Sequence, residues 1–205
     1  MKIISSVLGE LETNCYLLLD EQSSLAAIID PADNAGQLSA LLAREGATLA
    51  YILLTHGHRD HTLAAPTLHE LFPDAKVYIH PGDKRGAGIY HYPPCELIPE
   101  ILYYEDGDTL PLGALTIEVL HTPGHTAGSV TLRCENALFT GDTLFAGSCG
   151  RIDLPGAVPE QMLPSLRRLA LLSGDYAVYP GHMEETTLSR ERRVNPFLRQ
   201  AMTQA

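Results

Sequence analysis

The strongest constraint on the fold of this chain is a series of apolar segments of strand length. They are rich in β-branched or aromatic residues, and many of them end at Gly, Pro, Asp or Asn. Several follow one another with no helical pattern between them, which argues against a regular alternation of strand and helix. The sequence therefore predicts two layers of sheet with helices outside. The segments are residues 15–20, 25–30, 50–55, 76–80, 115–121, 129–134, 136–141 and 175–180.

Helical patterns lie between or after these segments. Apolar residues at helical spacing precede Gly46, Pro73 and Gly174, residue types that commonly follow a helix. Pro66 fits its helix only in the first turn, and Pro164 leaves the start of the third helix open. The expected helices cover residues 38–45, 63–71 and 162–169.

Two further segments are less regular. Residues 186–200 predict a helix whose continuity is limited by Pro196. Residues 82–99 show no clean period and contain many helix and strand breakers. They predict a long surface loop or insertion, and such loops near a site often shape substrate entry.

Length and charge bound the class of protein. A chain of 205 residues with 45% hydrophobic content predicts a single domain over residues 1–205. A formal charge of −11 and the absence of a Lys/Arg run argue against a nucleic-acid partner. No apolar run reaches the length of a signal peptide or the roughly 20 residues of a membrane span. We therefore expect a cytoplasmic protein with no membrane partner.

The stretch THGHRDH places His56, His58, Asp60 and His61 directly after a strand-like segment. Any one of these histidines alone would more often be an ordinary hydrogen-bonded residue. Four ligand-type side chains together at a strand end favour metal binding instead. One loop rarely turns four such groups onto a single ion, so the pattern predicts two adjacent ions. Zinc accepts both imidazole and carboxylate ligands.

Three other strand ends have the same arrangement. In each, a glycine immediately precedes a ligand-type residue, which lets the backbone turn sharply and approach a site closely. These ligand-type residues are His125, Asp142 and His182. With the first loop, four strand ends carry seven candidate ligands. The four cysteines contain no C-x-x-C pair, so a cysteine-based zinc site or redox dithiol is not indicated.

The motifs THGHRDH, TPGHT, TGD and PGH, in that order, resemble those of the metallo-β-lactamase fold superfamily. FAGSCGRIDLPG and ERRVNPFLR add a similarity to the short glyoxalase-II-like (hydroxyacylglutathione hydrolase-like) hydrolases. The resemblance extends over nearly the whole chain. It implies an α+β fold, namely an αβ/βα sandwich of two mixed β-sheets with outer helices. The site is then expected at one edge, between the two sheets.

The resemblance also implies two metal ions that share one carboxylate. The first ion would be bound by His56, His58 and His125. The second would be bound by Asp60, His61 and His182. Asp142 would bridge the two ions, and Asp60 and Asp142 would be the catalytic carboxylates.

Other ionisable residues near these motifs have two readings. Asp30 either orients a ligand histidine or is a turn residue before Pro31. The remaining histidines do not match the ligand pattern and are expected to have no role in metal binding. They are His69, His80, His91 and His121. His121 lies four residues before His125, but a structural role is expected for it too.

The expected activity follows from the two ions. Two divalent ions about 3.5–4 Å apart can hold a bridging water and lower its pKa towards roughly 7. The resemblance therefore implies a binuclear metal-dependent hydrolase in which a metal-bridging hydroxide attacks a small-molecule thioester, such as S-lactoylglutathione or a related thiol ester. Zinc is the expected metal, and iron and manganese accept the same ligands. The acyl group, the thiol carrier and the oligomeric state are left open by the sequence.

Arg151 is the candidate substrate-binding residue. It stands where glyoxalase II proteins carry a basic residue that contacts glutathione, and the arginine fork suits a carboxylate. An ion pair with Asp153 is an equal alternative. The chain also ends soon after NPFLR, without a helical C-terminal extension, and Glu184 stands where those enzymes usually carry a tyrosine. We therefore expect a more open site that accepts another thiol carrier or broader esters.

A different chemistry is available to the same scaffold. Persulfide dioxygenases resemble this chain around residues 148–151 and use one iron at positions that match His56, His125 and Asp142. Two histidines and one carboxylate are typical of non-haem Fe(II) oxygenases. On that alternative Cys149 gains interest, whereas otherwise it is a small passive residue. We favour the hydrolase, and the full set of ligands argues against a non-enzymatic scaffold.

Overall fold

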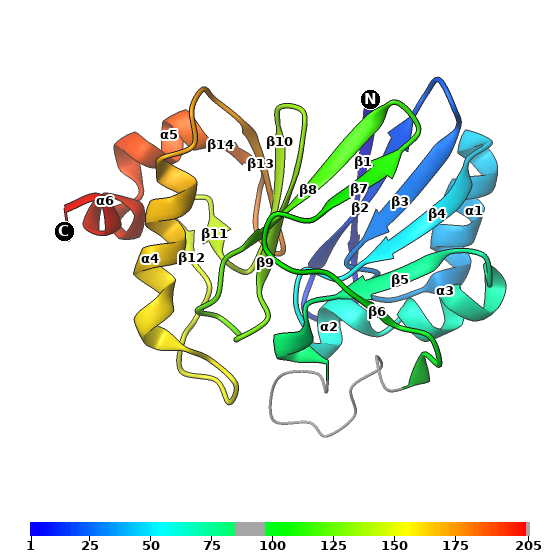
Figure 1. Ribbon diagram of the computed structural model, residues 1–205, viewed down its shortest axis with the longest axis horizontal. Coiled ribbons are helices and arrows are strands. Elements are labelled where there is room, and N and C mark those ends of the chain that lie inside the picture. The colour runs from blue at the N-terminus through cyan, green and yellow to red at the C-terminus, as the bar shows by residue number, and fades with distance from the viewer. Residues whose placement is uncertain (85–96, 204–205) are drawn as a thin grey trace.

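Two mixed β-sheets lie face to face in the computed structural model, and helices cover the outer face of each sheet (Figure 1). The structure describes residues 1–84 and 97–203. The first sheet has the strand order β1 (Lys2–Leu8), β2 (Thr13–Asp20), β3 (Leu25–Ile29), β4 (Thr48–Leu53), β5 (Lys76–Ile79) and β6 (Leu102–Tyr103). The second has the order β14 (Thr186–Thr187), β13 (Ala177–Pro180), β10 (Ala137–Gly141), β9 (Val130–Cys134), β8 (Leu115–His121) and β7 (Thr109–Leu112).

The helices divide between the two outer faces. The first sheet is covered by α1 (Ala35–Glu45) and α3 (Ala65–Leu71), and the second by α4 (Pro159–Ala170), α5 (Leu188–Val194) and α6 (Pro196–Thr203). A short hairpin, β11 (Leu144–Phe145) and β12 (Ser148–Cys149), follows β10. Two short helices, α2 (Arg59–Thr62) and the 3₁₀ helix η1 (Pro81–Asp83), follow β4 and β5. The expected α+β sandwich of two mixed sheets is confirmed.

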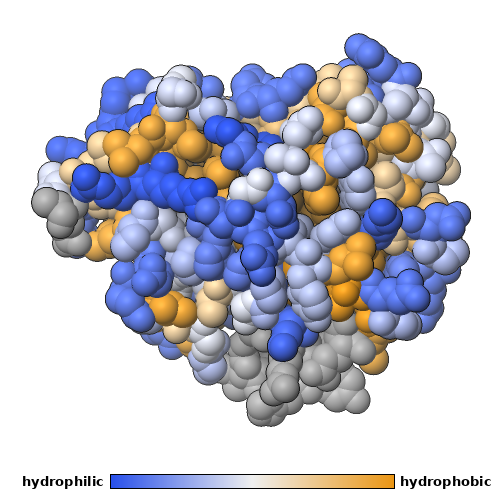
Figure 2. Space-filling model, viewed as in Figure 1, coloured by the Kyte–Doolittle hydropathy of each residue, from blue (hydrophilic) through white to orange (hydrophobic). Residues whose placement is uncertain are grey.

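Strand β2 shows why the central strands read as continuous apolar runs. Side chains alternate across a strand, so Tyr16 and Leu18 enter the apolar layer between the two sheets. Leu17 and Leu19 enter the layer under α1 and α3. All residues of β2 are buried, because both faces of the first sheet are covered. On the outer surface, apolar and polar residues are interspersed on the face seen in Figure 2.

The helix signals of the sequence are confirmed with small shifts. Asn34 caps α1 by accepting a hydrogen bond from the Gln37 amide, and Gly46 ends it in the left-handed region, with φ of 61°. Pro66 lies in the first turn of α3, as its missing amide requires. Helix α4 begins earlier than predicted, so Pro164 lies inside it.

All the predicted central strands are present, but the edges were missed. Strand β1 contains two adjacent serines and mostly exposed or half-exposed side chains, and β7 contains Pro111, so neither has the apolar run of a central strand. The predicted loop at residues 82–99 lies mainly outside the described residues. Among the described helices, none has both the length and the apolar character needed to cross a membrane.

The C-terminal motif ERRVNPFLR holds its helices against the β11–β12 hairpin. Asn195 separates α5 from α6, and its Nδ2 donates to the carbonyls of Phe145 and Ser148. Its Oδ1 accepts from the first amides of α6. The buried Glu191 accepts from the Gly147 amide and from Asn195. These bonds fix the hairpin that follows directly on Asp142.

Candidate metal centre

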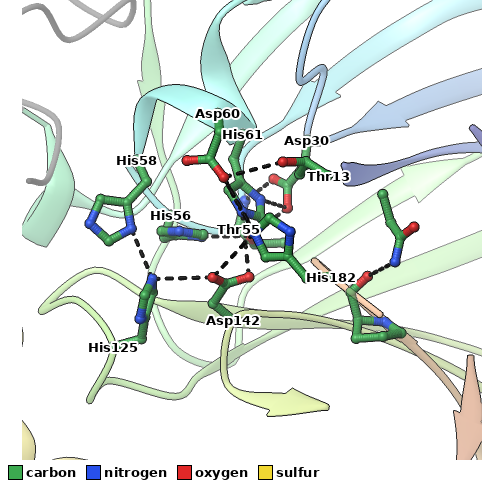
Figure 3. Close-up of polar contacts among 12 residues, drawn as sticks. Thr13, Asp30, Thr55, His56, His58, Asp60, His61, His125, Asp142 and His182 are labelled. Carbon is green, nitrogen blue, oxygen red and sulfur yellow. Dashed lines mark hydrogen bonds and ion pairs between the residues drawn. The ribbon is translucent and has the colours of Figure 1, made fainter. Parts of the chain in front are cut away.

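The seven predicted ligands converge at the ends of four strands, between the two sheets (Figure 3). They lie in the loops that follow β4, β8, β10 and β13. The seven side chains are His56, His58, Asp60, His61, His125, Asp142 and His182. Most are buried, whereas Asp60 and His182 are partly exposed.

Two groups of three could each hold a metal ion. In His56, His58 and His125, one ligand atom of each residue lies within 4.8 Å of the others. His58 Nδ1 and His125 Nε2 are 2.8 Å apart. The second group is Asp60, His61 and His182, whose ligand atoms also lie within 4.8 Å of one another.

Asp142 lies between the two groups. Its Oδ2 is 3.3 Å from His125 Nε2, and its Oδ1 is 3.4 Å from His61 Nε2. Oδ2 is also 3.7 Å from His182 Nε2. One carboxylate therefore faces both groups of three.

Hydrogen bonds behind the imidazoles fix which nitrogen faces the centre. His125 Nδ1 lies 2.7 Å from the Arg151 carbonyl, and His182 Nδ1 lies 3.1 Å from the Leu11 carbonyl. A carbonyl only accepts, so both rings carry their proton on Nδ1 and present Nε2. The Thr55 hydroxyl, which donates to Asp30, lies 3.1 Å from His56 Nδ1 and holds that ring in the same way.

Asp30 is the carboxylate behind His61. Its Oδ2 lies 2.9 Å from His61 Nδ1, and its oxygens also accept from the amide and hydroxyl of Thr55. Asp30 could form a further group of three with His56 and His61. Because both of its oxygens already accept hydrogen bonds, its geometry fits the orienting role rather than that of a ligand.

The buried polar atoms of the centre fit a cation. Within the described residues, His56 Nε2 and Asp142 Oδ1 are buried and make no hydrogen bond. Orphaned buried nitrogen and oxygen atoms are rare, because leaving one without a partner costs free energy. Imidazole and carboxylate donors at these distances suit a borderline divalent ion such as zinc.

Proton affinities differ across the centre. Burial and the neighbouring imidazoles lower the pKa of His56 well below its usual value, and burial with His125 lowers that of His58 to about 4. Burial alone would also lower the pKa of His61, but Asp142 and Asp30 raise it to about 9. Without a metal, His56 and His58 are neutral rings ready to bind, whereas His61 holds a proton. Metal binding at His61 would release that proton.

Close approach explains two of the glycines before the ligands. A Cβ on Gly181 would lie 2.3 Å from Asp142 Oδ1 and 2.6 Å from His61 Cε1. A Cβ on Gly141 would lie 2.3 Å from the Thr55 hydroxyl oxygen, and its φ of 46° also favours glycine. A larger residue at either position would displace side chains of the centre.

One buried carboxylate of the site escaped the sequence analysis. Asp83, in η1, accepts from the Gly57 amide at 2.8 Å, from the Gly128 amide at 2.8 Å and from the Thr126 hydroxyl at 2.6 Å. It thereby ties the loop of His56 and His58 to the loop of His125. The PGD stretch carried a turn signal, but no local pattern indicated these distant partners.

The side chain of Arg151 has an intramolecular partner. Its Nε and Nη2 donate to Asp153 at 2.7 and 2.9 Å, and both side chains are largely exposed. This is the ion pair that the sequence left as an alternative to substrate binding. The backbone carbonyl of Arg151 serves the centre through His125.

The other histidines that the structure describes lie outside the two groups of three. His80 and His121 stack with ring centroids 4.1 Å apart, and His121 Nε2 donates to the Ala127 carbonyl at 2.9 Å. His69 lies in α3. His91 lies outside the described residues. Cys149 is half-buried, and burial raises the pKa of its thiol to about 11, which disfavours the thiolate.

Comparisons with known proteins identify the family of the chain. The model of the metallo-beta-lactamase superfamily matches residues 8–182. An uncharacterized protein of Mycobacterium tuberculosis is 38% identical, with 93% of this chain and 94% of that protein covered. Hydroxyacylglutathione hydrolase GloC of Haemophilus influenzae is 33% identical, with 91% and 93% covered. The chain belongs to the metallo-β-lactamase superfamily.

Solved structures show the same fold. BLEG-1 B3 metallo-beta-lactamase has a TM-score of 0.85 and 33% identity, with 96% of this chain and 99% of that chain covered. TTHA1623, in a di-iron-bound form, has a TM-score of 0.81 and 38% identity, with 95% and 99% covered. ETHE1 from Myxococcus xanthus has a TM-score of 0.82 and 28% identity, with 99% and 91% covered.

Proposed function

We propose that this protein is a binuclear metal-dependent hydrolase of thioesters. The observation that carries the proposal is the position of Asp142, whose two oxygens face His125 on one side and His61 on the other. His56, His58 and His125 would hold one ion, Asp60, His61 and His182 the other, and Asp142 would be shared. Two ions held there would supply Lewis acidity and lower the pKa of a water molecule.

The rest of the chemistry belongs to residues that hold the centre in place. Asp30, the Arg151 carbonyl and the Leu11 carbonyl keep the protons of His61, His125 and His182 on Nδ1, away from the reacting side. Asp60 receives a hydrogen bond from Thr13 at 3.2 Å, which fixes its rotamer. A centre fixed in this way needs little reorganisation when charge develops on the substrate.

The choice of thioesters rests on relatives. GloC of Haemophilus influenzae is a hydroxyacylglutathione hydrolase by name, and its similarity covers nearly the whole of both chains. Zinc is the metal that we propose, and the di-iron form of TTHA1623 makes iron the second choice. The contact of Arg151 with substrate, expected from the sequence, remains a prediction. In the structure, the Arg151 guanidinium donates to Asp153 instead.

A second candidate is a mononuclear iron persulfide dioxygenase. The likeness to ETHE1 favours it, and the iron would lie at His56, His125 and Asp142. Those three residues lie together here, since Asp142 Oδ2 is 3.3 Å from His125 Nε2 and the rings of His56 and His125 are 4.9 Å apart between centroids.

Metal content and activity, measured together, separate the two candidates. The protein is purified without added metal, analysed for metal per chain, and assayed for S-lactoylglutathione hydrolysis and for persulfide-dependent oxygen uptake. About two metals per chain, with thioester turnover and no oxygen uptake, is the expected result. One iron per chain with oxygen uptake would replace the hydrolase by the dioxygenase.

A further inference from the structure

A cleft of about 560 Å³ opens beside the metal centre. His58 and Asp60, two of the proposed ligands, form part of its wall. Another part of the wall comes from the turn between β1 and β2, which includes Leu11. A substrate whose carbonyl lay at the metal centre would therefore extend one arm into this cleft. Its volume lies within the usual range for small-molecule sites, roughly 300–1,000 Å³, and far exceeds what a small acyl group needs.

The cleft has an apolar part. Leu11, Leu63 and Leu154 line it, and Leu11 is 65% exposed. A ligand that covers an exposed leucine is bound more tightly, because apolar surface removed from water stabilises the complex by about 25 cal/mol per Å². These leucines fit the methylene chain of a ligand.

The charged residues of the cleft are Arg59, Glu10 and Asp33, apart from the proposed ligand Asp60. Asp33 accepts a hydrogen bond from the Asn34 amide at 2.6 Å. Arg59 lies in α2 between two proposed metal ligands, is exposed, and has no hydrogen bond or ion pair with any residue that the structure describes. Within the described part of the chain, its guanidinium is thus open to a ligand, whereas that of Arg151 donates two hydrogen bonds to Asp153.

We propose that the cleft receives the thiol portion of the substrate, an arm that is apolar near the sulfur and ends in a single anionic group paired with Arg59. This inference rests on the proposed thioester hydrolysis. A guanidinium binds a carboxylate through two parallel hydrogen bonds, which suits this pairing. Glu10 and Asp33 disfavour a second negative charge on the arm, because like charges in one cleft repel each other. The ligand class is therefore a monoanionic thiol carrier.

The test compares three acetyl thioesters that differ in the charge of the thiol: N-acetylcysteamine with none, 3-mercaptopropionate with one carboxylate, and mercaptosuccinate with two. The metal-loaded wild-type protein should show the highest kcat/KM on the singly charged thioester. In Arg59→Ala, the ratio of kcat/KM for 3-mercaptopropionate over N-acetylcysteamine should fall about fivefold to tenfold. Arg59→Lys should keep part of the preference, and Arg44→Ala, which removes the same charge from α1, should keep all of it.

A binding measurement makes the inference independent of turnover. Dissociation constants for the S-ethyl thioethers of 3-mercaptopropionate and N-acetylcysteamine are measured by NMR titration on wild type, Arg59→Ala and Arg151→Ala. Tighter binding of the anionic thioether, lost in Arg59→Ala, supports the site even if no thioester is hydrolysed, and in that case only the proposed function fails. Equal binding of both thioethers by the wild type, or a preference lost in Arg151→Ala rather than Arg59→Ala, overturns the inference.

Discussion

Asp30 Oδ2 lies 2.9 Å from Nδ1 of His61, on the side of the ring opposite Nε2, which is 3.4 Å from Asp142 Oδ1. Asp30 adopts a left-handed backbone conformation, with φ of 50°, which is uncommon outside glycine. The conformation is held because the Asp30 amide donates to the Leu53 carbonyl while its side chain receives Thr55. The geometry at the end of β3 thus orients a histidine that comes from another loop.

Replacing Asp30 should weaken the second metal position. In Asp30→Ala, His61 loses the acceptor that fixes its ring, so the affinity for the more weakly bound ion should fall about 10-fold to 100-fold. Competition with a chromophoric chelator measures that affinity. Asp74→Asn, an exposed change in a turn, is the control for lost charge. Unchanged affinity in a folded Asp30→Ala protein would show that Asp30 is only a turn residue.

Removing the shared carboxylate should affect both ions. Asp142→Ala should bring metal content below two per chain and lower kcat/KM about 10³-fold, because losing several kcal/mol of metal-derived stabilisation of the transition state corresponds to that factor. His56→Ala should lower activity comparably by weakening the first ion. Metal analysis after desalting and thioester kinetics provide the measurement. Full two-metal occupancy with normal turnover in Asp142→Ala would rule out the bridging role.

Asp83 should be important for stability and for the first ion together. Asp83→Asn places an amide donor against at least one of the Gly57 and Gly128 amides or the Thr126 hydroxyl, so we expect a loss of about 2–3 kcal/mol in the free energy of unfolding. Urea unfolding of the metal-free protein gives this value, and chelator competition gives the affinity of the His56, His58 and His125 position. A variant with wild-type stability and affinity would mean that the three loops are held without Asp83.

Asp20 should make the metal-free protein sensitive to acid. Its carboxylate accepts from the Ser23 hydroxyl at 2.6 Å and from the Ala114 amide at 3.0 Å, so it links the β2–β3 turn to the β7–β8 turn of the other sheet. The Ser23 hydrogen bond and the Ala114 amide lower the pKa of Asp20 from 3.8 to about 2. A lowered pKa in the folded state stabilises the protein above pH 3.8 and loses that contribution as the pH falls towards 2.

The Asp20 prediction is checked by the urea midpoint as a function of pH. Asp20→Asn should be less stable than wild type near neutral pH, and the difference should shrink between about pH 4 and pH 2, where wild type loses its ionised carboxylate. Asp74→Asn, an exposed change in a turn, should not change the shape of the profile. A constant difference between Asp20→Asn and wild type at all pH values would contradict the assigned shift.

The central strands and the main helices could be predicted because their signals are local. A strand covered on both faces, such as β2, is apolar throughout, and Gly46 or Pro66 marks a helix end or beginning by its own backbone chemistry. Edge strands such as β1 and β7 escaped prediction, since half-exposed residues and a proline remove the apolar run. Their place in the sheets depends on pairing with distant strands.

The kinds of ligand in the centre were also readable, because THGHRDH and the three glycine-preceded ligands are short motifs. The support around them was only partly readable. Asp30 could be named as an orienting residue without its partner being fixed. No local pattern indicated the role of Asp83, because its donors lie 26 to 45 positions away along the chain. The sequence also left Arg151 between a substrate contact and an ion pair with Asp153.

The sequence by itself determined the layered α+β fold and which side chains have the chemistry to bind a cation, since hydrophobic period and residue type are properties of the chain. Only the tertiary structure decided that Asp142 faces both groups of three and that Asp30 and Asp83 hold the loops. It also decided that Arg151 is paired with Asp153, whereas Arg59, beside the centre, has no partner among residues 1–84 and 97–203. These relationships join residues far apart in sequence. They arise because the two sheets pack face to face, and no local pattern encodes the distance between their loops.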